Sequence, residues 1–586
     1  MLKLISNLWV EIPRPRKKQL KLLLVLMVIS SLFEVISIGL VIPFLGILVD
    51  PVRFAQQSYL QPYLNEIGLD NHKNIAYFFT TLFCGAFVSS GAVRLLTQWL
   101  NLKVSFAIGA ELSSILFYRT MHQGYEDHIL RNSSEIINAI TVKMAYLMSA
   151  ISNIITIALS VIIMILFCTI LMIANPLYTA IIVCILLIFY LAINSVSKKI
   201  LIRNSERISI NSGRTIKILQ ESLGSYRDIL LDNSQKFHVQ EFDKANKVLW
   251  ESEGKVRFMS SAPRYLIETL GLIALSITAL TLTLNGETMT SMLPLIGALV
   301  LAIQRMLPAM QSIYSSWAGV RGSQDMIMDA IGLMRETIIK PLENANSNKM
   351  IFKREIEFKN VYFKYGKKLQ FTLEEVNLKI KYGEKIGIIG STGSGKSTFV
   401  DLFMGLLKPN FGEIYIDGQL INQDNLLLWQ KKIGHVPQSI YLTDASIAEN
   451  IAFNIPKNLI DFDRVVRAAK QAQISAYIES LPDKYSTRVG ERGGRLSGGQ
   501  RQRIGIARAL YREADLIIFD EATSALDHET EYSIVDSIEA LSSKLTVLII
   551  SHRLECLRIC NRILEVKDGS VSELKNNNLY EYSKKN

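Results

Sequence analysis

The hydropathy pattern divides the chain into an apolar first part and an alternating second part. Before Val320, long stretches carry almost no charge, and residues 144–197 contain no Asp, Glu, Lys, Arg or His. About 20 apolar residues cross a bilayer, so this run is long enough for two spans, with Asn175-Pro176 as the turn between them. The same pattern predicts six transmembrane helices along the chain: roughly 20–49, 74–100, 145–174, 177–197, 263–284 and 289–316.

The charges between these spans predict their orientation. Residues 198–257 carry 12 lysines and arginines, whereas the turns at 175–176 and 285–287 carry none. Because basic loops stay on the cytoplasmic side, the N-terminus, residues 101–144 and residues 198–262 are expected in the cytoplasm, with helices that continue beyond the bilayer. The connection 50–73 then lies outside, either as an amphipathic helix on the membrane surface or as a plain connector.

After Val320 the pattern changes to short apolar strands alternating with helical segments. EIEFKNVYFKY, KIGIIG, LIIFDE and TVLIISH read as strands. The expected organisation is therefore a membrane-embedded, all-α domain of six helices over residues 1–320, a linker over 321–351 and a soluble α/β domain over 352–586.

Composition supports this division. The 586 residues are 49% hydrophobic and carry a formal net charge of +11. In a chain with six spans, this basic balance reflects cytoplasmic loops, and the spans exclude a soluble nucleic-acid ATPase; no nucleic-acid partner is expected. The five cysteines show neither a metal-ligand spacing nor a disulfide framework and are read as packing residues.

A phosphate-binding loop follows the strand KIGII. The pattern G-x-x-x-x-G-K-S begins at Gly390 and leads into a helix, which is the context that a P-loop requires. Its backbone N–H groups and the helix N-terminus suit phosphate oxygens, Lys396 suits the β and γ phosphates, and the Ser397 hydroxyl suits Mg²⁺. The predicted nucleotide-binding residues here are Gly390, Ser391, Thr392, Gly393, Ser394, Gly395, Lys396, Ser397 and Thr398.

Two carboxylates end the apolar strand LIIF. Asp520 suits the Mg²⁺ shell, and Glu521 suits a general base that polarises the attacking water. Taken alone, two acids at a strand end are equally typical of a solvated turn. Together with the P-loop, they favour ATP and Mg²⁺ as the ligands of the α/β domain.

The pentapeptide Leu496-Ser497-Gly498-Gly499-Gln500, with the motifs above and their order, resembles the nucleotide-binding domain of ABC transporters. The resemblance implies an ATPase. It implies that Tyr365 stacks on adenine, that Gln438 takes part in metal binding and catalysis, and that His552 takes part in catalysis. It also implies nucleotide contacts for the signature residues Ser497, Gly499 and Gln500 and for Asp527 of the D-loop.

The resemblance also implies a homodimer, because the signature of one ABC chain closes over the nucleotide held by the other. One set of motifs after six spans is similar to an exporter half-transporter. Residues 124–138 and 222–233 are then candidate coupling helices between the two domains.

Three arginines in or beside the predicted spans are candidate substrate ligands. A charged side chain at the bilayer centre is costly, so Arg305, Arg264 and Arg94 are each expected to face a cavity or a partner. Arg94 is also placed to reach the cytoplasmic interface, and Arg264 has Glu268 at i+4 as a partner. Glu34 lies in the first span and is a candidate partner for one of the arginines. Guanidinium groups match phosphate oxygens, which favours an amphiphile with an anionic head.

The stretches SSLFEVISIGLVIPF, SAPRYLIETLG and LAIQRMLPAM resemble spans of bacterial lipid-linked oligosaccharide flippases of the N-glycosylation pathway. This resemblance implies ATP-driven movement of a polyprenyl-pyrophosphate-linked saccharide between the leaflets of the bacterial cytoplasmic membrane, with membrane lipid and the anionic saccharide as partners. An exporter of another amphiphile (glycolipid, peptide or drug) remains an alternative, as does an ATP-gated membrane regulator.

Overall fold

A computed structural model gives the architecture. It describes residues 2–49, 72–174, 176–284, 289–336, 350–366, 370–522, 531–532, 535–536, 539, 545–551, 553 and 557–574. The chain forms two compact units. The first comprises Met1–Gln123 and Arg131–Ile338, and the second comprises Gly124–Leu130 and Ile339–Asn586. The predicted external segment 50–73 lies almost wholly outside the described residues.

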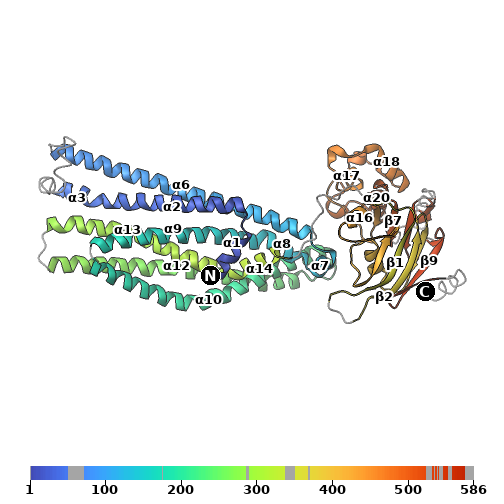
Figure 1. Cartoon of the computed structure of the whole chain (residues 1–586), viewed down its shortest axis with the longest axis horizontal. Helices are drawn as coiled ribbons and strands as arrows, with labels where there is room; N and C mark the ends of the chain where they lie inside the picture. The colour runs from blue at the N-terminus through green and yellow to red at the C-terminus, as the bar shows by residue number, and fades with distance from the viewer. Residues whose placement is uncertain are drawn as a thin grey trace. The chain divides into compact units, whose positions relative to one another are not determined.

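The first unit is built of long helices that run alongside one another (Figure 1). Each predicted span is helical, and the helices of the second, fourth and fifth predicted spans continue well beyond the predicted bounds, into the stretches expected on the cytoplasmic side. The helices are α1 (Leu2–Glu11), α2 (Arg14–Gly39), α3 (Val41–Val49), α6 (His72–Met121), α8 (Ser133–Asn138), a π-helical turn (Ala139–Lys143), α9 (Met144–Ala174), α10 (Pro176–Gly224), α11 (Tyr226–Leu231), α12 (Gln235–Leu284), α13 (Met289–Gly322) and α14 (Gln324–Met334).

Within the described residues, three helical stretches are long and apolar enough to cross a membrane: Arg14–Leu48, Asn74–Met121 and Ser133–Thr169. Large apolar side chains lie on the outside of these stretches. Leu22, Val88 and Leu95 are each more than 70% exposed, at 72%, 73% and 74%. Such exposure suits contact with lipid chains, because an apolar surface of this kind is costly in water.

Apolar packing holds the helices together on their inner faces. Leu23 and Met27 of α2, Ile108 and Leu112 of α6, and Ile151 of α9 belong to one buried cluster. Gly109 permits the close approach of α6 to α9, because a Cβ at this position would lie 1.9 Å from Cγ of Met148.

The helix α14 occupies part of the stretch that the sequence pattern assigns to a linker. Its residues Met326, Ile327, Ala330 and Met334 are buried. These four positions recur at helical spacing, so the start of the predicted linker is an amphipathic helix of the first unit.

The second unit contains two sheets. The strands are β1 (Glu355–Phe363), β2 (Leu373–Lys381), β3 (Lys385–Ile389), β4 (Phe411–Ile416), β5 (Gln419–Leu420), β6 (Ile433–Val436), β7 (Leu516–Asp520), β8 (Thr546–Ile550), β9 (Arg562–Lys567) and β10 (Ser570–Glu573). One sheet is antiparallel with the order β2-β1-β4-β5, and the other has the order β10-β9-β3-β8-β7-β6. In the second sheet, β3 pairs in parallel with both β8 and β9. The carboxyl end of β3 therefore lies between the carboxyl ends of these two strands.

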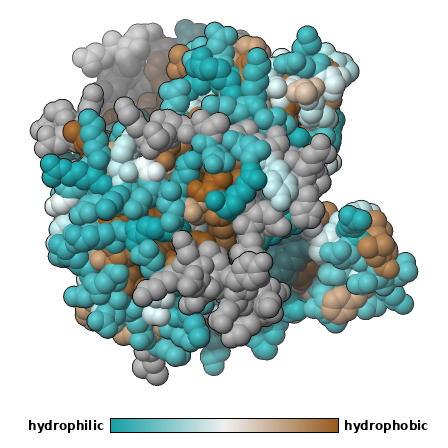
Figure 2. Space-filling model, turned by 90° about the vertical axis from the view of Figure 1, so that its right-hand side faces the viewer, coloured by the Kyte–Doolittle hydropathy of each residue, from teal (hydrophilic) through white to brown (hydrophobic). Residues whose placement is uncertain are grey.

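Helices cover these sheets: α15 (Lys396–Phe403), α16 (Leu426–Gln430), α17 (Ile447–Ile451), α18 (Phe462–Gln471), α19 (Ser475–Ser480) and α20 (Gly498–Tyr511). Phe399 and Phe403 of α15 pack with Phe358 of β1 and Ile386 and Ile388 of β3 in one core. This packing fixes α15 between the two sheets, directly after the P-loop. The face of the molecule in Figure 2 is mainly hydrophilic, with separate hydrophobic areas.

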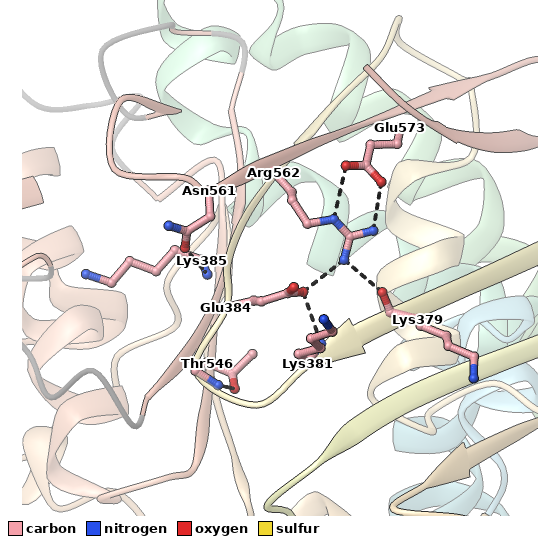
Figure 3. A network of polar contacts seen from close by, with 9 residues as sticks. Lys379, Lys381, Glu384, Lys385, Thr546, Asn561, Arg562 and Glu573 are labelled. Carbon is pink, nitrogen blue, oxygen red and sulfur yellow. Dashed lines mark hydrogen bonds and ion pairs between the residues drawn. The ribbon is translucent and has the colours of Figure 1, made fainter. Parts of the chain in front are cut away.

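An arginine network ties the two sheets together at the start of β3 (Figure 3). Arg562 donates to the Lys379 carbonyl and to Glu384 Oε2, each at 2.9 Å, and its Nη2 donates to Glu573 Oε2 at 2.9 Å. These two carboxylates and burial act on the guanidinium, and the net effect raises the pKa of Arg562. One planar cation thus joins β2, β9 and β10, and it anchors β3 from the end opposite the P-loop.

Candidate functional site

The P-loop turns sharply between β3 and α15. Gly393 and Gly395 have φ of +83° and +105°, a region that only glycine adopts readily. A Cβ on Gly395 would lie 3.1 Å from the Thr372 carbonyl oxygen and from Leu373 Cδ2. The loop therefore needs glycine for both conformation and space, and it brings its backbone N–H groups to the N-terminus of α15.

Lys396 lies across this loop. Its Nζ donates to the carbonyl oxygens of Gly390 at 2.7 Å and Ser391 at 3.0 Å. Burial lowers the pKa of Lys396, and the nearby carboxylates of Glu521 and Asp520 oppose this shift. The lysine is thus held over the loop, within electrostatic range of both acids.

The aromatic residue expected to contact adenine lies beside the first turn of α15. The Tyr365 hydroxyl is 3.1 Å from Thr398 Oγ1, and its ring packs edge-on against Phe363. Burial raises the pKa of the Tyr365 phenol. Tyr365 and Thr398 are 33 residues apart in sequence, and the fold brings both predicted residues to one place.

The two acids after β7 have different surroundings. Burial and the neighbouring Glu521 raise the pKa of Asp520. Glu521 has a φ of +47°, its N–H donates to the Ile550 carbonyl at 3.0 Å, and its Oε2 accepts from Gln438 Nε2 at 2.7 Å. The predicted base is therefore held by the predicted glutamine.

The signature residues begin α20. Ser497 caps this helix, with its Oγ accepting from Gln500 N at 3.2 Å while Gln500 Oε1 accepts from Ser497 N at 2.8 Å. Gly499 lies in the first turn. This reciprocal capping leaves the remaining N–H groups of the first turn available to an anion. Farther along α20, Gln502 donates to the Glu521 carbonyl at 3.4 Å, which links the signature helix to the predicted base.

Sequence reasoning missed one acid near this site. Asp401 on α15 lies near Asp520, and burial with this second carboxylate raises the pKa of Asp401 to about 6. The available signal was its place in FVDLF, where it is the one charged residue in an apolar turn.

Two predicted residues, His552 and Asp527, lie outside the described residues. The candidate coupling segments contain short helices: α7 (Tyr125–Leu130) and α8 in the first, and α11 in the second. Of these, α7 belongs to the second unit.

The residues present fit Mg²⁺ and a nucleoside triphosphate. Ser394 Oγ in the P-loop is buried and has no hydrogen-bond partner among the described residues, and a cationic Nζ and two acids lie around the same loop. Ser397, Gln438 and Asp520 would hold the metal, which would neutralise phosphate charge.

In the first unit, the structure pairs Glu34 with Arg94. Arg94 Nη1 lies 3.1 Å from Glu34 Oε1, and the side chain of Glu34 is 5% exposed. The carboxylate on the first predicted span therefore has a cationic partner on the second, as the sequence suggested. The Arg94 side chain itself is 53% exposed, so the ion pair is compatible with its also reaching the interface.

Arg264 lines a cavity between α12 and α13. Its Nε donates to Glu268 Oε1 at 2.9 Å, and Gln311 Nε2 donates to the same oxygen at 3.3 Å. The cavity of about 290 Å³ is lined by polar side chains, Pro263 and Tyr314: Ser260, Ser261, Pro263, Arg264, Gln311, Ser312, Tyr314 and Ser315. Arg305 lies on α13, and its side chain is outside the description.

Two family models match the chain. The ABC transporter transmembrane region matches residues 39–323, and the ABC transporter domain matches residues 373–524. A solved bacterial Atm1-family ABC exporter has a TM-score of 0.77 and 23% identity, with 97% of this chain and 98% of that chain covered. The chain has the fold of an ABC exporter half-transporter. The predicted fold class and the ABC-type ATPase domain are both confirmed.

Curated proteins similar to this chain include proteins named as lipid A-core flippases. The ATP-dependent lipid A-core flippase of Legionella pneumophila (strain Paris) is 32% identical over 379 residues, which cover 63% of this chain and 62% of that protein. ABC transporter B family member 29, chloroplastic, of Arabidopsis thaliana is 31% identical over 379 residues, covering 64% of this chain and 59% of that protein. The matched region thus spans about three fifths of each relative.

Proposed function

We propose that the chain works as a homodimeric ABC exporter in the bacterial cytoplasmic membrane and moves an anionic, lipid-linked saccharide from the inner to the outer leaflet. ATP binding would close the two nucleotide-binding domains, and hydrolysis would reset them. Within this class, a polyprenyl-pyrophosphate-linked saccharide is the proposed substrate. The proposal rests on the ATPase motifs, the fold and the chemistry of the first unit.

In the nucleotide site, each side chain has a task that its surroundings suit. Glu521 would orient the attacking water, because Gln438 and the Ile550 carbonyl fix both its carboxylate and its backbone. Lys396 would meet the phosphates in place of the loop carbonyls. Asp527 and His552 keep the roles that the motif context suggests.

The observation that carries the substrate proposal is the cavity at Arg264. It combines one guanidinium with serine hydroxyls and an amide, contributed by both α12 and α13. Guanidinium binds phosphate oxygens, while hydroxyls and amides pair with sugar hydroxyls. Arg305 lies 7 residues before Ser312, about two helical turns along α13, which supports a row of polar groups rather than a single one.

The relatives support a second candidate. The Legionella pneumophila relative is named a lipid A-core flippase, so a glycolipid of that kind is the alternative cargo for this chain. The same cavity would receive its polar head.

ATPase stimulation in lipid nanodiscs tests the proposal. Turnover of the purified dimer is measured with a polyprenyl-pyrophosphate oligosaccharide, with lipid A-core and with neither, for wild type, Arg264→Ala and Arg305→Ala. Arg257→Ala is the matched control, because Arg257 lies on the same helix and its side chain is 82% exposed. Glu521→Gln serves as the inactive reference.

We expect the lipid-linked oligosaccharide to stimulate wild type and Arg257→Ala, and the two other arginine variants to keep basal turnover but lose stimulation. Stimulation by lipid A-core alone would replace the proposed substrate with the second candidate. Equal responses in all four proteins would remove the arginines from the substrate site.

A further inference from the structure

The short helix α7 contacts the loop that carries Tyr365. Gly366 N, the next backbone amide after Tyr365, donates to Glu126 Oε1 at 2.9 Å. The partners are 240 residues apart in sequence, and both belong to the second unit. A carboxylate that accepts from a backbone N–H forms a charge-assisted bond, which is stronger than a neutral one.

A second residue of α7 lies against the same site. Burial raises the pKa of Tyr125, and both Asp401 and Tyr365 add to this shift electrostatically. The Tyr125 side chain is therefore near the loop and α15, as well as next to Glu126 in sequence. Two adjacent residues of α7 thus face the surroundings of Tyr365.

The ends of the α7 segment are joined at its base. Gln123 Nε2 donates to Glu336 Oε2 at 2.5 Å, and Arg131 Nη1 donates to the same oxygen at 2.6 Å. Residues 123 and 131 flank α7 and belong to the first unit, as does Glu336. The carboxylate of Glu336 thus bridges the residues on either side of α7 and holds the two ends of this segment close together.

We propose that Glu126 is a positioning residue for the nucleobase: by holding Gly366, it orders the Tyr365 ring where the base binds. This inference rests on the proposed function, in which Tyr365 meets adenine. Affinity for the nucleoside part of ATP then depends on α7, a segment whose two ends are covalently continuous with α6 and α8. The triphosphate part, held by the P-loop, does not depend on it.

Nucleotide affinity of the full-length protein separates these two parts. The dissociation constants of ATP and of inorganic tripolyphosphate, each with Mg²⁺, are compared for wild type, Glu126→Ala, Glu126→Gln and Asp127→Ala. Asp127 is the matched control, since it is the next acid on the same short helix. Glu126→Gln retains an oxygen acceptor for the Gly366 N–H.

We expect Glu126→Ala to weaken ATP binding by about threefold, in line with loss of an exposed hydrogen bond, and to leave tripolyphosphate binding unchanged. Glu126→Gln and Asp127→Ala should both behave like wild type. In a Tyr365→Ala background, Glu126→Ala should have no further effect, because it acts through that ring.

Equal weakening of ATP and tripolyphosphate would overturn the proposal, because it would indicate a general loss of structure. Unchanged ATP affinity in Glu126→Ala, or an additive effect with Tyr365→Ala, would overturn it as well. Absence of ATP binding in wild type would instead overturn the proposed function itself, and this inference with it.

Discussion

At the scale of single residues, burial of Asp401 makes its ionised carboxylate unfavourable in the folded state. Its carboxyl lies on α15 near Asp520, and its pKa of about 6 is above the ordinary value of 3.8. A raised pKa means that the folded state favours the protonated carboxyl. The corresponding stability is present in full below about pH 4 and is lost as the pH rises through about 6.

Replacement of this acid by its neutral isostere should therefore stabilise the nucleotide-free protein. We expect Asp401→Asn to raise the melting temperature at pH 8 by about 2 °C, with a smaller rise at pH 5. Differential scanning fluorimetry at both pH values measures this, with the exposed Asp424→Asn as the control. A rise of equal size at both pH values would show that ionisation of Asp401 is not the cause.

Single residues also show the limit of sequence reasoning. Lys396 and Asp520 could be found because their motifs are local. Glu126 could not, because its role comes from a partner that only the fold supplies: it meets Gly366 across 240 positions. Asp401 gave a weaker signal, as the one charged residue in an apolar turn, and its proximity to Asp520 also depends on the fold. Likewise, the sequence offered Glu34 several arginines, and packing of α2 against α6 selected Arg94.

At the scale of elements, two helices of the second unit begin with the same capping arrangement. Ser446 and Glu449 form a capping box at α17, and Ser497 and Gln500 form one at α20. The serine in each box satisfies backbone N–H groups that would otherwise lack partners. Only the box at α20 lies in the predicted signature. Comparing variants of the two boxes therefore distinguishes an effect on stability from an effect on ATPase activity.

Alanine at either serine should cost about 1 kcal/mol of stability, as is usual for the loss of an N-cap. We expect Ser446→Ala to keep its ATPase turnover and Ser497→Ala to lose most of it, because the second also removes a phosphate contact. Urea unfolding and steady-state ATPase assays check the two parts. Equal turnover in both variants would leave Ser497 with a structural task alone.

The helices and strands themselves could be predicted well from the pattern. The six apolar segments are helical, and the P-loop lies between β3 and α15 as its motif requires. The sequence pattern predicts a linker where α14 lies, because the role of its apolar residues becomes clear only when the fold provides a surface that buries Met326 and Ile327. The cavity at Arg264 also depends on packing, since its serines come from two separate helices.

At the scale of the whole molecule, the proposed homodimer places each nucleotide between two chains. The P-loop at Lys396 would come from one chain and the signature at Ser497 from its partner. Heterodimers of two different inactive chains can test whether the P-loop and the signature of one site come from different chains.

Lys396→Ala and Ser497→Arg should each inactivate a homodimer. A heterodimer of the two, purified through two different tags, contains one site with both halves intact and one with neither. We expect it to recover about half of the wild-type ATPase activity, since one of two sites is restored. No recovery would mean that the P-loop and signature of the same chain act together.

The pair of Glu34 and Arg94 has a consequence for how the protein enters the membrane during synthesis. Glu34 lies on α2 and Arg94 on α6, so the carboxylate is made 60 residues before its cationic partner. A lone charge costs about 3 kcal/mol to insert at the bilayer centre. The two helices therefore enter the lipid most favourably together, as a hairpin in which the second neutralises the first.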